Sequence, residues 1–132
     1  DWRILDEGTL GHFNLRMLYL AELPSEDAQR AADGWAGDRY LAFQNETTGD
    51  TAALLIQSWD TIRDAQEAYL TWRDYGETRI AARDPLGQAY EFRSDELFAR
   101  LERTSYQTLW IMAPDPEIGA ALREAMTFPW EP

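Results

Sequence analysis

The segment that most constrains the fold is an amphipathic helix predicted near the middle of the chain, from Thr61 to Gly76. Asp60 or Thr61 can cap this helix, Thr61 and Asp64 have the spacing of an N-terminal capping box, and glycine commonly follows a helix end. The apolar residues recur at helical spacing: Ile62, Ala65, Tyr69 and Trp72. Apolar runs of strand length precede and follow this helix, at 51–59 and 104–113. This alternation predicts a mixed α and β domain.

The first half of the chain predicts two further helices and a hairpin. Thr9 can cap a helix over 9–21, and Ser25 can cap a second one that ends at Gly34. Strands are expected at 39–45 and 51–59, joined by a polar turn that contains a glycine.

The second half predicts three strands, a helix and a tail. The strands are expected at 89–93, 97–103 and 104–113, after an Asp-Pro-Leu-Gly turn at 84–87. Asp115, followed by Pro116 and Glu117, predicts the start of a helix. The aromatic tail at 128–132 is expected to pack back onto the domain or to continue into a further segment.

These elements follow the order α-α-β-β-α-β-β-β-α. Strands joined by hairpins, with helices between them, predict an α+β fold of two layers, in which an antiparallel sheet of about four to five strands packs against helices. A chain of 132 residues suits one domain over residues 1–132. Its first residue is aspartate, so we expect a fragment or a mature portion of a longer protein.

The composition excludes several chemistries. The chain has no cysteine and no lysine, which rules out a disulfide framework, a thiolate nucleophile, cysteine-bound metals and a Schiff-base lysine. A net charge of −12 argues against nucleic acid as a partner, because phosphate binding needs a basic face. No apolar run approaches the roughly 20 residues of a membrane span. We therefore expect no cofactor, no metal and no membrane-spanning segment.

The single histidine offers little for catalysis. His12 is expected in the first turn of a helix, where a surface or half-buried structural role is the more economical interpretation. No serine lies in a G-x-S-x-G elbow, so a serine triad has no support. Nothing in the sequence selects one pair of carboxylates from the 24 acidic residues. Catalytic residues are therefore not assigned, and the chain is expected not to be an enzyme.

The segment from Gly34 to Arg39, with Trp59 and Asp60, is the most distinctive candidate site. As a ligand site it would use four polar residues: Asp38, Arg39, Tyr40 and Asp60. A structural interpretation is favoured, in which Trp35 fills the core and the polar side chains fix the start of the strand. In either case the hairpin is expected to bring Trp35 and Trp59 close together.

The aromatic residues Tyr69, Trp72 and Tyr75 fall on one helix face. Such a stripe can line a pocket or a partner surface, but more often it belongs to the core, which is the interpretation favoured here.

Three motifs carry a resemblance: Thr9-Leu10-Gly11-His12-Phe13, Gly34-Trp35-Ala36-Gly37-Asp38-Arg39-Tyr40, and Trp59-Asp60-Thr61 before an alanine-rich helix. They resemble a C-terminal domain of uncharacterised exported proteins of Chloroflexi, actinobacteria and haloarchaea, where it often follows a segment similar to a zinc-metallopeptidase helix. The resemblance covers about residues 5–75. It implies an extracellular or cell-envelope setting and an accessory role. This chain has no H-E-x-x-H motif, and it has His12 where the family often has glutamate.

The sequence thus leaves two functions open. The first is a non-catalytic accessory or interaction domain of an exported prokaryotic protein, in contact with a neighbouring domain, a peptide or a small ligand. The alternative is a small-molecule- or peptide-binding domain, or an enzyme, with a pocket near the Trp35–Arg39 loop and Trp59-Asp60. The ligand, the oligomeric state and the parent protein are not fixed by the sequence.

Overall fold

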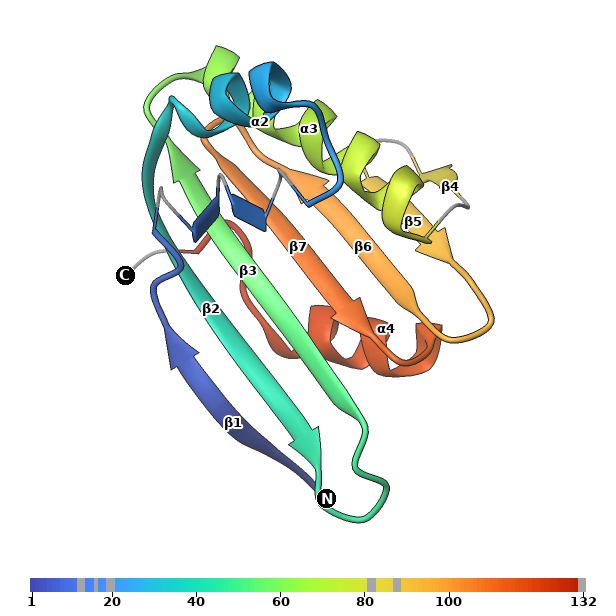
Figure 1. Ribbon diagram of the computed structural model, residues 1–132. Helices are drawn as coiled ribbons and strands as arrows, with labels where there is room; N and C mark the ends of the chain where they lie inside the picture. Colours follow the sequence, from blue (N-terminus) through green and yellow to red (C-terminus); the bar gives the residue numbers. More distant parts are fainter. Residues whose placement is uncertain (12–13, 16, 19–20, 81–82, 87–88, 131–132) are drawn as a thin grey trace.

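The computed structural model describes residues 1–11, 14–15, 17–18, 21–80, 83–86 and 89–130 (Figure 1). It contains seven strands: β1 (Trp2–Gly8), β2 (Trp35–Asn45), β3 (Thr51–Trp59), β4 (Arg83–Leu86), β5 (Ala89–Arg93), β6 (Phe98–Arg103) and β7 (Gln107–Ala113). The helices of this described part are α2 (Ser25–Ala32), α3 (Ile62–Ile80) and α4 (Pro116–Ala125).

The seven strands form one antiparallel sheet in the order β1-β2-β3-β7-β6-β5-β4. The central strand β7 and its neighbour β3 come from opposite halves of the chain. They pair directly, from Ala53 opposite Met112 to Ser58 opposite Gln107. β1 and β4 are the edge strands, and β1 is the blue strand along the left edge of the sheet in Figure 1.

Helices cover both faces of the sheet. On one face, here the α3 face, Trp72 and Tyr75 of α3 pack on sheet residues that include Leu55 and Trp110. On the other, the α4 face, Leu122 of α4 and the C-terminal tail pack against a second apolar cluster: Leu54, Ile56, Leu109 and Ile111. Figure 1 shows α2 and α3 in front of the sheet and α4 behind it. The domain therefore has three layers.

The predicted sheet of four to five strands in two layers is wrong, and so is the predicted element order. The signal for a third layer is present in β3, where four consecutive residues, Leu54 to Gln57, are buried. Side chains alternate between the two faces of a strand, so an unbroken buried run requires cover on both faces.

The two additional strands were not predicted because each lacks a strand signal. All residues of β1 except Gly8 are exposed, so the hydrophobic alternation that reveals a half-buried strand is missing. β4 contains Pro85 within a segment expected to turn. Proline is tolerated there because β4 is an edge strand, and an edge strand needs no inward hydrogen bond at every residue.

The helix predicted over 9–21 lies partly outside the described residues, and His12 lies outside them altogether. Of the described residues in this range, 14–15 and 17–18 are helical, and the Leu15 amide donates to the Gly11 carbonyl at 3.0 Å. Leu15 is fully buried against the cluster under α3.

The predicted start of α3 is confirmed, but the predicted end is wrong. The Asp64 amide donates to Thr61 Oγ1 at 3.0 Å, and the Thr61 hydroxyl donates back to the Asp64 carboxylate at 2.8 Å. Gly76 does not end the helix, which continues to Ile80. A Cβ at position 76 would lie 2.6 Å from Cε1 of Phe92, so this glycine permits close packing of α3 on β5.

The core interpretation of the aromatic stripe is confirmed. Trp72 and Tyr75 are buried, and the ring of Trp72 stacks on Trp110 with 4.8 Å between centroids. Tyr69 is half-buried and lies 5.4 Å from Tyr90, measured between ring centroids. The start of α4 is also as predicted, since the Ile118 amide donates to the Asp115 side chain at 2.9 Å and Pro116 begins the helix.

Candidate functional site

The four residues predicted as a ligand site do not share one surface. Asp38 and Tyr40 lie on the α3 face, because they are register partners of Gln57 and Leu55. Arg39 is the partner of Ile56 and lies on the α4 face. Asp60 follows β3 and precedes α3. The alternation of side chains along β2 therefore separates Arg39 from its two neighbours.

Asp38 accepts hydrogen bonds from three donors. One carboxylate oxygen accepts from the Leu10 amide at 2.6 Å, and the other accepts from the Gly11 amide at 3.0 Å and from the indole Nε1 of Trp35 at 2.9 Å. The carboxylate thus holds the segment after β1 and orients Trp35 at the start of β2. A carboxylate with these partners has a structural use, although its side chain remains half-buried.

Arg39 and Tyr40 connect β2 with β1. Arg39 forms an exposed ion pair with Glu7 at 3.3 Å. The Tyr40 hydroxyl donates to the Asp6 carboxylate at 2.8 Å. This hydrogen bond raises the pKa of Tyr40, with smaller contributions from burial and from the charge of Asp6, so the hydroxyl keeps its proton at neutral pH.

The backbone of Asp60 links the end of β3 to the residue before β2, because its amide donates to the Gly34 carbonyl at 2.9 Å. The predicted proximity of the two tryptophans is confirmed, since Trp35 and Trp59 are register partners across β2 and β3. Gly34 is required by packing, because a Cβ there would lie 2.2 Å from Cγ of Asp64.

A row of polar side chains crosses the α3 face under α3. The register places Asp38, Gln57, Thr108 and Arg103 next to one another on four adjacent strands. Each of the first three accepts a hydrogen bond from a tryptophan indole, namely those of Trp35, Trp72 and Trp59. Within the described chain, Nε2 of the buried Gln57 has no hydrogen-bond partner. The row lies beneath α3, and its hydrogen bonds orient the three tryptophan indoles.

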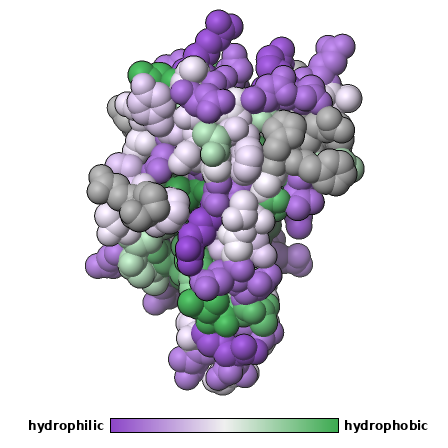
Figure 2. All heavy atoms as spheres, turned by 90° about the vertical axis from the view of Figure 1, so that its left-hand side faces the viewer, coloured by the Kyte–Doolittle hydropathy of each residue, from purple (hydrophilic) through white to green (hydrophobic). Residues whose placement is uncertain are grey.

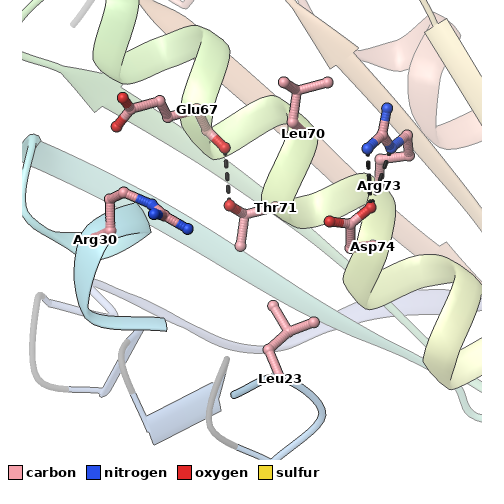
Figure 3. Close-up of a pocket in the computed structure, with 7 residues that line it drawn as sticks. All are labelled: Leu23, Arg30, Glu67, Leu70, Thr71, Arg73 and Asp74. Carbon is pink, nitrogen blue, oxygen red and sulfur yellow. Dashed lines mark hydrogen bonds and ion pairs between the residues drawn. The ribbon is translucent and has the colours of Figure 1, made fainter. Parts of the chain in front are cut away.

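A polar cleft lies between α2 and α3, bordered by Arg30 of α2 and by Glu67, Thr71 and Asp74 of α3 (Figure 3). The polar groups drawn in Figure 3 already have partners. Thr71 donates to the Glu67 carbonyl at 2.8 Å, Asp74 accepts two bonds from Arg73, and Glu67 pairs with Arg63 at 3.3 Å. These contacts give the cleft a structural explanation as the boundary between two helices.

A second polar hollow of about 300 Å³ lies beside Asp38 and Arg39. Glu7, Gly8, Thr9 and Trp130 complete its lining. Asp38 and Arg39 both border this hollow, although their side chains lie on opposite faces of β2, and Tyr40 and Asp60 do not line it.

An apolar opening lies on the α4 face, between β1–β2 and α4. Its volume is about 310 Å³, and its lining residues are Trp2, Arg3, Ile4, Phe43, Ile118, Ala121 and Leu122. We name it the α4-face groove. Figure 2, which looks at the β1 side of the sheet, shows apolar side chains gathered in the lower half of the molecule. Ile4 is 53% exposed and Trp2 is 36% exposed, so these side chains are not used to fill the core.

The groove exists because the α4 face is covered only in part. The buried cluster of this face packs against Met126, Phe128 and Trp130 of the tail, which confirms that the tail packs back. Phe43 and the α4 residue Leu122 reach the same cluster, but Ile4 of β1 remains exposed. Sequence reasoning missed this groove because it did not predict β1. The available signal was the pair Trp2 and Ile4, two residues apart and therefore on one face of a strand.

The described part of the chain lacks two other features, a cluster of metal ligands and a membrane-spanning helix. No group of three or more histidine, aspartate and glutamate side chains is arranged to hold a metal ion there. Within the same residues, no helix combines the length and the apolar character that crossing a bilayer requires.

Comparison with known proteins gives one family assignment. Neither the curated proteins nor the solved structures include a significant match to this chain. A family profile described as "Domain of unknown function (DUF8575)" matches residues 3–123. The match runs from β1 to Arg123 of α4, and so includes both sides of the α4-face groove. The chain therefore belongs to the DUF8575 domain family.

Proposed function

We propose that this domain is a non-catalytic interaction module, and that the α4-face groove is its binding site. The observation that carries the proposal is the exposed apolar lining of the groove, above all Ile4 and Trp2. Apolar side chains left exposed together next to a concavity are typical of surfaces that bind another molecule. The setting we propose is an exported prokaryotic protein, which is supported by the resemblance of the three motifs at Thr9, Gly34 and Trp59.

A neutral apolar dye tests the groove without knowledge of the natural partner. Nile red is expected to gain fluorescence on binding the folded protein, and Ile4→Asp is expected to remove most of this gain. Leu5→Asp is the matched control, because Leu5 is 48% exposed on the same strand and does not line the groove. Equal loss in both variants, or no dye binding to the folded wild type, would contradict the groove as a binding site.

The non-catalytic part has a separate test. The purified chain is expected to hydrolyse no ester, peptide or glycoside substrate above background. A robust activity that is abolished by substitution of His12 would overturn this part of the proposal.

A second candidate is a small polar ligand in the hollow beside Asp38 and Arg39. It is favoured by the approach of these two residues to one opening that also includes Glu7 and Thr9. Arg39→Gln would then weaken ligand binding in a screen of small acids, whereas Arg63→Gln would not, because Arg63 lies on α3 and does not line the hollow.

A further inference from the structure

We infer that the partner bound in the α4-face groove is an amphipathic helix with basic residues along its polar side, which packs beside α4 and completes the outer layer of the α4 face. This inference rests on the proposed function, because it names the occupant of the same groove.

The helical form of the partner is inferred from the side of α4 that faces the groove. Ile118, Ala121 and Leu122 line the groove and have the i, i+3, i+4 spacing of one helix stripe. Ala125 continues this stripe one turn later and is exposed. Ile118 and Leu122 also pack on the sheet, so Ala121 and Ala125 are the exposed part of the stripe, and their small side chains allow a second helix to approach closely. The floor of the groove is a sheet surface, on which helices commonly pack.

The edge of the sheet is less suited to a partner in strand form. The pairing of β1 with β2 shifts register between Ile4 and Asp6, so Leu5 is an extra residue in a β-bulge. Bulges and charged residues on an edge strand disrupt the regular hydrogen bonding that an added strand needs, and β1 has both.

The basic character of the partner is inferred from charge. Arg3, the positive residue in the lining of the groove, is already paired with Glu46 at 2.7 Å. Glu117 of α4 is exposed and, within the described residues, has no ion-pair partner. Glu117 directly precedes Ile118 and lies four residues before Ala121, which places it next to the stripe. Lysine or arginine on the partner would therefore meet the unpaired carboxylate of Glu117, on a chain whose formal net charge is −12.

A second copy of the chain is disfavoured as the occupant by the same charges. Each copy carries a formal charge of −12, so two copies that approach through this face repel one another. A basic segment instead gains attraction that speeds association and that salt weakens.

The inference is tested with the whole chain and synthetic peptides of about 18 residues, long enough for about five helical turns. One peptide places leucines on one helix face and lysines on the other. A second has the same composition in strict alternation, as in a strand, and a third replaces every lysine of the first with glutamate. Binding is followed by backbone and indole NMR resonances of the isotope-labelled protein.

We expect the helical basic peptide to bind about tenfold or more tightly than either other peptide, with saturable shifts of the Trp2 indole and the Ile4 amide. Ile4→Asp should weaken this binding about tenfold or more, whereas Leu5→Asp should change it less than about twofold. Glu117→Gln should reduce both the affinity and its dependence on salt.

Each contrary result has a defined meaning. Equal or tighter binding of the alternating peptide, or of the acidic helix, overturns the inference. A dimer in sedimentation experiments that Ile4→Asp dissociates overturns it in favour of a second copy. If dye binding depends on Ile4 but no helical basic peptide binds in an Ile4-dependent way, the inference fails and the proposed function stands. If the dye test fails as well, both fail.

Discussion

The side-chain amide of Gln107 binds both backbone polar groups of Trp130. Its Nε2 donates to the Trp130 carbonyl at 2.9 Å, and its Oε1 accepts from the Trp130 amide at 2.9 Å. A side chain of β7 thus pairs with the C-terminal tail as a neighbouring strand would. This contact holds Trp130 against the α4 face, beside the apolar cluster of that face.

The first prediction concerns this contact. Gln107→Ala removes two hydrogen bonds to the tail, so the free energy of unfolding should fall by about 1–2 kcal/mol in urea denaturation. The Trp130 amide should also exchange with solvent faster, because its hydrogen-bond acceptor is lost. Gln66→Ala is the control, since Gln66 is exposed on α3. Unchanged exchange at Trp130 would contradict the role given to Gln107.

The second prediction concerns Gly76, where replacement by alanine should lower the free energy of unfolding, the reverse of its usual effect in a helix. Replacement of a glycine inside a helix by alanine normally stabilises by about 1 kcal/mol. Here the added Cβ would lie 2.6 Å from Cε1 of Phe92, which is completely buried and cannot move aside. Gly76→Ala should therefore lower the free energy of unfolding by about 1–3 kcal/mol.

A double variant tests the cause of that loss. Phe92→Leu makes room beside position 76, so Gly76→Ala should cost less in the Phe92→Leu background than in the wild type. This non-additivity in a double-mutant cycle is the expected sign of direct contact. Additive losses would show that the cost of Gly76→Ala has another origin.

Helix starts could be predicted from sequence because their signals are local. The capping pairs at Thr61 and Asp115 lie within four residues of the groups that they bind. The third layer was missed because it depends on which face of the sheet α4 covers, and α4 lies far along the chain from β3. The available clue in the sequence was the unbroken apolar run of Leu54, Leu55 and Ile56, all of which are buried in the structure.

The candidate site was harder to predict than the fold, for the same reason. The α4-face groove joins Ile4, on a strand that is exposed throughout, with Ile118 near the other end of the chain. No local pattern links two such residues. The residues that looked distinctive, from Gly34 to Arg39, include a carboxylate that binds backbone amides and an indole. Unusual local sequence at this position reflects a tight structural contact.

The third prediction separates Asp38 from its neighbour Arg39. Asp38→Ala leaves two backbone amides and the Trp35 indole without their acceptor, so the free energy of unfolding should fall by about 2–4 kcal/mol. Arg39→Ala removes one exposed ion pair and should cost less than about 1 kcal/mol. Chemical denaturation followed by tryptophan fluorescence measures both. Equal costs would mean that the hydrogen bonds of Asp38 contribute little.

The fourth prediction concerns pH and rests on Glu102. Burial opposes ionisation of this side chain, but hydrogen bonds from Arg123 and Arg100 outweigh burial and lower its pKa. In the unfolded chain the pKa returns to about 4.3. A carboxylate whose pKa is lower in the folded state stabilises the fold above the unfolded value, and this contribution is lost as the pH falls through the folded value.

Glu102→Gln should therefore lower the free energy of unfolding at pH 7, by about 1–3 kcal/mol, because two arginines lose a charged acceptor. The difference between the variant and the wild type should shrink as the pH falls from about 5 towards the folded pKa, since protonated Glu102 resembles glutamine. Urea denaturation across this pH range measures the difference. Glu96→Gln is the control, because Glu96 is exposed and has no ion-pair partner within the described chain. A difference that stays constant across this range would show that the charge of Glu102 does not stabilise the packing of α4 on β6.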